Sequence, residues 1–224
     1  MLRPVGPRFD AAAALLAAAG CSVAHNPLSN LRIGSGVAPV RQMLEHGINV
    51  GIGTDAANTS DTQNMFEATR LASYLSRLCD VDWDRWLGAQ EVLRMATEGG
   101  ARLLGMEGQI GRLSPGYRAD FVVLRLDQVQ YTPLRQTVLQ LVNGESGSSI
   151  ESVAVDGRFV LDHGRITTLD EDKLRRDAHA AALQLDEANL HAAGLAAELR
   201  PYLGAFCSEH GRTPLSVRRR LTRP

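Results

Sequence analysis

The sequence predicts an α/β protein in which a parallel βα segment leads into a small antiparallel β module and a long C-terminal helix. Over the first half of the chain, helix-period segments alternate with short apolar runs, which is typical of βα units that feed a parallel sheet. Further along, Asp156-Gly157 separates two apolar runs and is a strong hairpin signal. From Asp170 to Leu199 the chain is rich in Ala and Leu with interspersed charged residues, which predicts an amphipathic helix that Pro201 ends.

The parallel segment contains two candidate strands, each preceded by a helix. In chain order we expect a helix over 11–19 with Asp10 as its N-cap, a strand over 21–24, a polar loop over 25–36, a helix from Pro39 to Gly47 and a strand over 48–52. The tripeptide Gly53-Thr54-Asp55 follows the second strand. Because parallel α/β folds carry their chemistry at the carboxyl ends of strands, this tripeptide marks the edge where a site is expected.

The rest of the chain divides at two changes of composition. We expect a helix over 61–78, short helices over 90–96 and 101–104 separated by Gly99-Gly100, and strands over 110–113, 121–126, 152–155 and 158–161. The predicted domains are a parallel βα segment over 1–105, a β-sandwich-like portion over 106–169 and a helical extension with a tail over 170–224.

Charge and composition argue against several kinds of partner. The 24 basic residues nearly balance the 25 acidic ones, so the net charge gives no reason to expect nucleic acid or anionic membrane partners. The dense basic cluster Arg218–Arg220 has no interleaved aromatic residues and is interpreted as a solvated terminus. No apolar run approaches the ~20 residues that a membrane span needs.

The cysteines predict a reducing environment. Cys21, Cys79 and Cys207 are widely spaced and odd in number, and they form no C-x-x-C pair, so neither a disulfide framework nor a zinc knuckle is indicated. The run Leu15–Cys21 imitates an exported lipoprotein signal, but the charge of Asp10 argues against export. We expect a cytoplasmic protein.

Two residues at the predicted strand ends are candidates for chemistry. Asp55 follows a glycine that lets the backbone turn closely, and a carboxylate there can bind a metal or accept a proton; it can equally be a loop hydrogen-bond acceptor. His25 ends the preceding strand and can serve as a ligand, a substrate hydrogen-bond donor or a packing residue. The other histidines lack ligand spacing, and no stretch completes a nucleotide-binding or nucleophile-elbow motif.

Several ordered motifs resemble the amidohydrolase superfamily, in its triazine hydrolase, chlorohydrolase and cytosine, guanine or adenosine-type deaminase branch. The matching runs lie between about residues 11 and 165 and are SVAHNPLSN (22–30), IGSGVAPV (33–40), NVGIGTD (49–55), QNMFEATRLA (63–72), ATEGGARLLG (96–105), IGRLSPGYRADFVVL (110–124) and VAVDGRFVLDHG (153–164). The first three are similar to the last two strands of that family's barrel and the loops that follow them.

This resemblance implies the C-terminal part of a (β/α)₈ metal-dependent hydrolase barrel, followed by a portion of a composite β domain. It implies one divalent metal, zinc or iron, in the intact family, where the metal activates water. Asp55 matches the family's last-strand metal ligand and proton shuttle, and His25 matches a histidine that shapes the substrate pocket.

The chain also departs from the family pattern. The family's H-x-H, its H-x-x-E and a further histidine have no counterpart here, only two barrel strands are expected, and residues 1–9 match nothing, as a truncated gene model would produce. Because a lone aspartate offers one ligand where about three are needed, we expect this chain alone not to hold the metal.

Three functional hypotheses follow. The first is a hydrolase or deaminase that acts on non-peptide C–N bonds of a small heterocyclic substrate, inactive alone and completed by a homo-oligomer or by a complementing N-terminal half. The alternative is a non-catalytic structural or interaction subunit built from the β module and the long helix. A third hypothesis is a small ligand-binding α/β module that uses the loops after Ala24 and Gly53.

Overall fold

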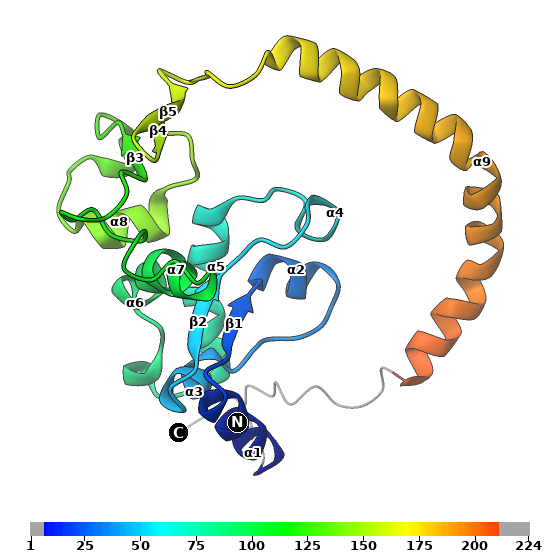
Figure 1. Ribbon diagram of the computed structural model, residues 1–224. Coiled ribbons are helices and arrows are strands. Elements are labelled where there is room, and N and C mark those ends of the chain that lie inside the picture. The colour runs from blue at the N-terminus through cyan, green and yellow to red at the C-terminus, as the bar shows by residue number, and fades with distance from the viewer. Residues whose placement is uncertain (1–6, 211–224) are drawn as a thin grey trace.

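The computed structural model describes residues 7–210 and shows a mixed α/β chain (Figure 1). The strands are β1 (Ser22–His25), β2 (Asn49–Ile52), β3 (Phe121–Leu124), β4 (Ile150–Val155), β5 (Arg158–Asp162) and β6 (Arg165–Ile166). The helices are α1 (Pro7–Ala18), α2 (Pro27–Arg32), α3 (Val40–Glu45), α4 (Ala57–Ser60), α5 (Met65–Cys79), α6 (Ala89–Arg94), α7 (Gly100–Leu103), α8 (Thr137–Gly144) and α9 (Glu171–His210), with short turns η1 (Trp83–Arg85), η2 (Met95–Gly99) and η3 (Val129–Tyr131).

The predicted parallel pair is confirmed. β1 and β2 run parallel in a two-stranded sheet whose register pairs Ser22 with Asn49 and His25 with Ile52. Helices α1, α3, α5 and α6 contribute apolar side chains to the core around these strands. The buried core consists of Ala13, Val40, Ile48, Val50, Ile52, Ala68, Ala72, Leu87, Val92, Met95 and Val142. The strands are therefore held by helix packing as well as by each other.

The glycine pair 99–100 does not separate two helices, contrary to the prediction. Helix α6, the π-helical turn η2 and α7 run on continuously, and the pair packs against β2. A Cβ built on Gly99 would lie 2.5 Å from the carbonyl oxygen of Val50, and one on Gly51 would lie 3.2 Å from Gly100 Cα. Because these glycines lack a side chain, the helix and the strand can pack closely, and this outweighs the low helix propensity of glycine.

Two predicted helix starts are also wrong. Helix α1 begins at Pro7, so Asp10 lies in the first turn of the helix instead of capping it. The negative charge of Asp10 there interacts favourably with the helix dipole. Its Oδ1 also lies 3.3 Å from His46 Nε2. Helix α5 begins at Met65, because the Asn64 side chain accepts hydrogen bonds from the backbone N–H groups of residues 66 and 67.

The antiparallel module is a four-stranded sheet in the order β3-β4-β5-β6. Asp156 (φ 50°) and Gly157 (φ 77°) both adopt left-handed conformations between β4 and β5, as a two-residue hairpin of the predicted kind requires. The run 110–113 is not a strand: it forms bends, and the positive φ of Gly111 (91°) turns the chain tightly over the backbone of Thr97 and Glu98.

A buried carboxylate organises the approach to this sheet. Glu145, fully buried after α8, accepts a hydrogen bond from the Tyr131 hydroxyl (2.7 Å) and others from the N–H groups of Ser146, Gly147 and Ser149. Burial alone would raise the pKa of Glu145, but these hydrogen bonds, led by that from Tyr131, lower it to about 2. The charge is thus stabilised inside the fold by donors that surround it.

Helix α9 is longer than predicted, because it continues through Pro201 to His210. Proline removes one backbone donor from a helix, at a cost of ~3 kcal/mol or more. Residues 172–208 are all exposed, and Figure 1 shows α9 arching away from the rest of the fold. No helix within residues 7–210 combines the length and the hydropathy that a bilayer crossing requires. The basic cluster 218–220 and residues 1–6 lie outside the described part of the chain.

Candidate active site

The loop after β2 begins in close contact with the end of β1. The backbone N–H of Gly53 donates to the carbonyl oxygen of His25 at 3.0 Å, which extends the parallel ladder by one bond. A Cβ at position 53 would lie 2.4 Å from Asn26 Oδ1, so only glycine fits there without displacing the asparagine. This contact places the residues after Gly53 at the carboxyl edge of the two strands, as the sequence predicts.

Asp55 is held two residues further on by two hydrogen bonds to its carboxylate. The Ser29 hydroxyl donates to Oδ2 at 2.7 Å, and the N–H of Ala56 donates to Oδ1 at 2.8 Å. Ser29 lies on α2 and is only 2% exposed, whereas Asp55 itself is exposed. A buried hydroxyl therefore orients a carboxylate that faces solvent.

The backbone of this loop is unusual. Asp55 (φ 62°), Asp61 (φ 67°) and Gln63 (φ 50°) all adopt the left-handed region, which residues other than glycine rarely enter. Such conformations cost roughly 1–3 kcal/mol each and gather at functional sites. Arg32 Nε donates to Asp61 Oδ2 at 2.7 Å and ties the loop to α2.

The hydrogen bond from the Ser29 hydroxyl, followed by that from the Ala56 N–H, lowers the pKa of Asp55 below its ordinary value. The group is consequently ionised throughout the neutral range. An ionised, solvent-facing carboxylate in a fixed orientation can accept a proton or contribute one ligand to a cation.

His25 lies at the same edge but does not bind Asp55. Its side chain is 4% exposed, and burial lowers its pKa to about 4, so the imidazole is neutral at pH 7. Within residues 7–210 the ring makes no hydrogen bond. The two predicted site residues therefore come from neighbouring strand ends, and it is Ser29 that contacts the carboxylate of Asp55.

Sequence reasoning missed this role of Ser29. The sequence predicts a loop over residues 25–36, whereas Pro27 begins helix α2 in the structure. Ser29 is the third residue of this helix, and its hydroxyl contacts Asp55. Proline is favoured at the first position of a helix, so Pro27 was the available signal.

The described residues do not form a complete metal site. Within residues 7–210 no group of three His, Cys, Asp or Glu side chains converges. Asp55 and the neutral Ser29 hydroxyl provide too few ligands for a tightly held catalytic metal, which typically has about three protein ligands.

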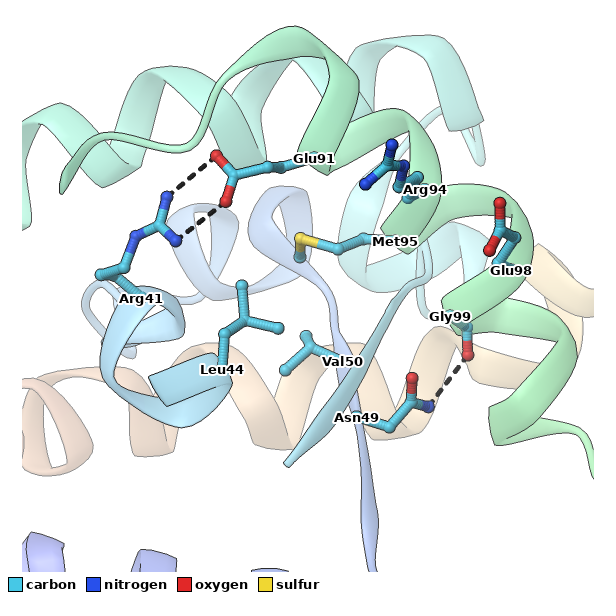
Figure 2. A pocket seen from close by; sticks show the side chains of 9 residues that line it. All are labelled: Arg41, Leu44, Asn49, Val50, Glu91, Arg94, Met95, Glu98 and Gly99. Carbon is cyan, nitrogen blue, oxygen red and sulfur yellow. Dashed lines mark hydrogen bonds and ion pairs between the residues drawn. The ribbon is translucent and has the colours of Figure 1, made fainter. Parts of the chain in front are cut away.

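A pocket of about 320 Å³ lies at the opposite end of β2 (Figure 2). Asn49, the first residue of β2, lines it with Val50, and the Arg41–Glu91 ion pair crosses one side. Asn49 also donates to the carbonyl oxygen of Gly99 at 3.0 Å. Because chemistry in parallel α/β folds lies at the carboxyl ends of strands, a catalytic site is not expected in this pocket at the amino end of β2.

The region of the chain that carries Asp55 is similar to known proteins. The family model described as "Amidohydrolase family" matches residues 5–160. A 5-methylthioadenosine/S-adenosylhomocysteine deaminase from Desulforudis audaxviator is 42% identical over 173 residues, which cover 77% of this chain and 40% of that protein. The chain thus spans about 40% of the length of this curated relative.

Solved structures show a similarity to the same group of enzymes. An adenosine deaminase from Xanthomonas campestris with bound zinc superposes with a TM-score of 0.76 at 30% identity, over 80% of this chain and 40% of that one. Atrazine chlorohydrolase from Arthrobacter aurescens, complexed with zinc, gives a TM-score of 0.71 at 33% identity over 79% and 38%. These neighbours confirm the predicted fold class, a partial segment of a (β/α)₈ barrel with a long C-terminal helix. The chain belongs to the amidohydrolase family.

Proposed function

We propose that this chain supplies the last two βα units, and the catalytic carboxylate Asp55, of a hydrolytic deaminase. The observation that carries the proposal is the Asp55 carboxylate itself, held by the buried Ser29 at the carboxyl edge of β1 and β2, inside the region that matches the amidohydrolase family. An ionised carboxylate fixed in this way is suited to general acid–base catalysis.

Asp55 serves as the proton carrier of the reaction. Hydrolytic deamination adds one water to a ring carbon and releases one ammonia. Asp55 accepts a proton from the water as its oxygen bonds to the carbon, and returns a proton to the departing nitrogen. His25, neutral at pH 7, offers hydrogen bonding to the substrate from the end of β1.

The substrate class we favour is an amino-substituted purine nucleoside. This choice rests on relatives that are named as deaminases of 5-methylthioadenosine and S-adenosylhomocysteine and on a neighbour named adenosine deaminase. The chlorohydrolase neighbour acts, by its name, on atrazine, and this agrees with the broader class of small nitrogen heterocycles.

The remaining ligands of a divalent metal, zinc or iron, come in this proposal from outside residues 7–210. Asp55 is then one ligand among several, and a complementing polypeptide equivalent to the uncovered part of the relatives provides the others. The two zinc-bound neighbours support zinc as the metal.

The test is co-expression of the full chain with the part of the Desulforudis relative that this chain does not cover. We expect the purified pair to release ammonia from 5-methylthioadenosine in the presence of zinc. Asp55→Asn should lower the rate by roughly 10²–10⁴-fold, the usual contribution of a general acid–base group. Asp61→Asn, which changes another exposed carboxylate of the same loop, is the matched control and should leave the rate nearly unchanged.

A co-purified, zinc-loaded pair that releases no ammonia would contradict the proposal. That result would favour the alternative of a structural or interaction subunit built from the β module and α9.

A further inference from the structure

Helix α9 carries an apolar stripe with the spacing of a coiled coil. Apolar residues recur at alternating intervals of four and three, without interruption, at Leu174, Ala178, Ala181, Leu185, Ala188, Ala192, Leu195, Leu199, Tyr202 and Phe206. Sustained repeats of this kind are typical of helices that pair along a seam. Pro201 lies outside the stripe, at a position of the repeat that faces solvent in a pair of helices.

From Leu174 to Tyr202 the residues of this stripe are all exposed in the described part of the chain. Leu185, Leu195 and Tyr202 are 60%, 52% and 75% exposed. Among residues 7–210, Figure 1 shows no other helix or strand packed along α9. A contiguous exposed apolar surface of this length marks an interaction site.

We propose that α9 pairs with α9 of a second copy of this chain in antiparallel orientation. When one of the two helices is reversed, each residue of the stripe faces a residue of the stripe on the other helix. Leu185 faces Leu195 of the second copy, Ala181 faces Leu199, and Ala178 faces Tyr202. At the centre Ala188 meets Ala192, while Ala178 and Ala181 each oppose a larger side chain.

A parallel pair fits less well. It would stack Ala178 on Ala178 and Tyr202 on Tyr202, which leaves gaps at one end and crowding at the other. It would also bring Asp186 level with its own copy, whereas the antiparallel register offsets the two carboxylates by eight residues, or roughly 12 Å along the axis. At physiological salt that separation exceeds the Debye length of ~8 Å, so the repulsion is largely screened.

The area available suits a specific dimer. Each copy contributes Leu174, Leu185, Leu195, Leu199 and Tyr202 to the seam, and a large apolar side chain buries roughly 60–120 Å². Two copies would bury roughly 1,000 Å² from these residues, before the alanines are added, and a specific interface needs about 1,000 Å² in total. Pairing with a second copy therefore buries enough area for a specific interface.

Light scattering on the full chain tests the pairing. Leu185→Glu with Leu195→Glu places charges in the seam and should shift the dimer to monomer, with the dissociation constant raised ~100-fold or more. The matched control is Leu183→Glu with Leu190→Glu, which changes equally exposed leucines on the opposite side of the same helix (59% and 71%) and should leave the dimer intact. Circular dichroism checks that both variants keep their helix content.

A monomeric wild-type chain, or a dimer that survives the seam variant, would overturn the proposal. Loss of the dimer in the control would do the same, because it would assign the interface to the opposite face.

Disulfide cross-linking tests the orientation. With Cys21, Cys79 and Cys207 changed to serine, chains that carry Ala181→Cys are mixed with chains that carry Leu199→Cys. The antiparallel register predicts mostly mixed disulfides between the two variants. Predominant disulfides within each variant alone would show a parallel pair and contradict the register.

Discussion

Ser29 lowers the pKa of Asp55 by donating a hydrogen bond to Oδ2. Ser29→Ala removes the strongest of the interactions that lower the pKa of Asp55, so that pKa should rise. Because the proposed mechanism uses the ionised form of Asp55, the acid limb of the rate–pH profile of the complemented pair should move to higher pH. Ser29→Thr, which keeps the hydroxyl, should move it back toward wild type. An unchanged acid limb in Ser29→Ala would show that another group governs the ionisation.

Glu145 makes stability depend on pH in the acid range. Its pKa is lowered from an unfolded value of about 4.3 to about 2, so the stabilisation is fully present above the unfolded value and is lost as pH falls from about 5 through 2. Glu145→Gln removes the charge and turns amide hydrogens toward backbone donors, and should lower the free energy of unfolding by about 2–4 kcal/mol at pH 7. Urea unfolding at pH 7 and pH 3 measures both effects. An equally large loss of unfolding free energy at pH 7 and at pH 3 would contradict the assignment of this pH dependence to Glu145.

At the scale of elements, the glycines of the helix over β2 are constrained by contact. Gly99→Ala would put a Cβ 2.5 Å from the Val50 carbonyl oxygen and should cost roughly 1–3 kcal/mol or more. Gly194→Ala in α9 meets nothing within 4 Å and should be neutral or stabilising by up to about 1 kcal/mol. Thermal unfolding of the two variants compares them directly, and equal melting temperatures would contradict the contact argument.

The elements that follow from local sequence rules were predictable, and those set by distant contacts were not. The alternation around residues 48–52 and the Asp156-Gly157 turn predicted β2 and the hairpin correctly. The continuity of the helix across Gly99 depends on β2, fifty residues away in sequence, so local propensity pointed the wrong way. Helix α9 continues past Pro201 although residues 172–208 are all exposed, so burial of its side chains among the described residues does not explain why.

The candidate site shows the same limit. Asp55 and His25 could be placed at one edge because parallel strands end together. That Ser29 is the residue that contacts the Asp55 carboxylate depends on helix α2, whose position the sequence pattern did not reveal. The division into domains at residues 105 and 170 stays a prediction.

At the scale of the whole molecule, the described residues contain one part of the proposed site and lack the rest. The described residues hold an oriented, ionised carboxylate, but they bring no cluster of metal ligands together. The family match and the 40% coverage of a curated relative are consistent with a site that this chain shares with other residues. Self-pairing through α9 leaves the Asp55 edge free for a complementing polypeptide, because the two surfaces lie on different elements.

The central claim is that Asp55 is this chain's contribution to a metal site whose other ligands lie elsewhere. Its most direct test is the zinc bound per chain, measured by elemental analysis after dialysis, for the full chain alone, for the complemented pair and for the pair with Asp55→Asn. From this assignment we expect little zinc in the chain alone, near-stoichiometric zinc in the pair and a clear loss in the variant pair. Stoichiometric zinc in the chain alone, retained after Asp55→Asn, would contradict it.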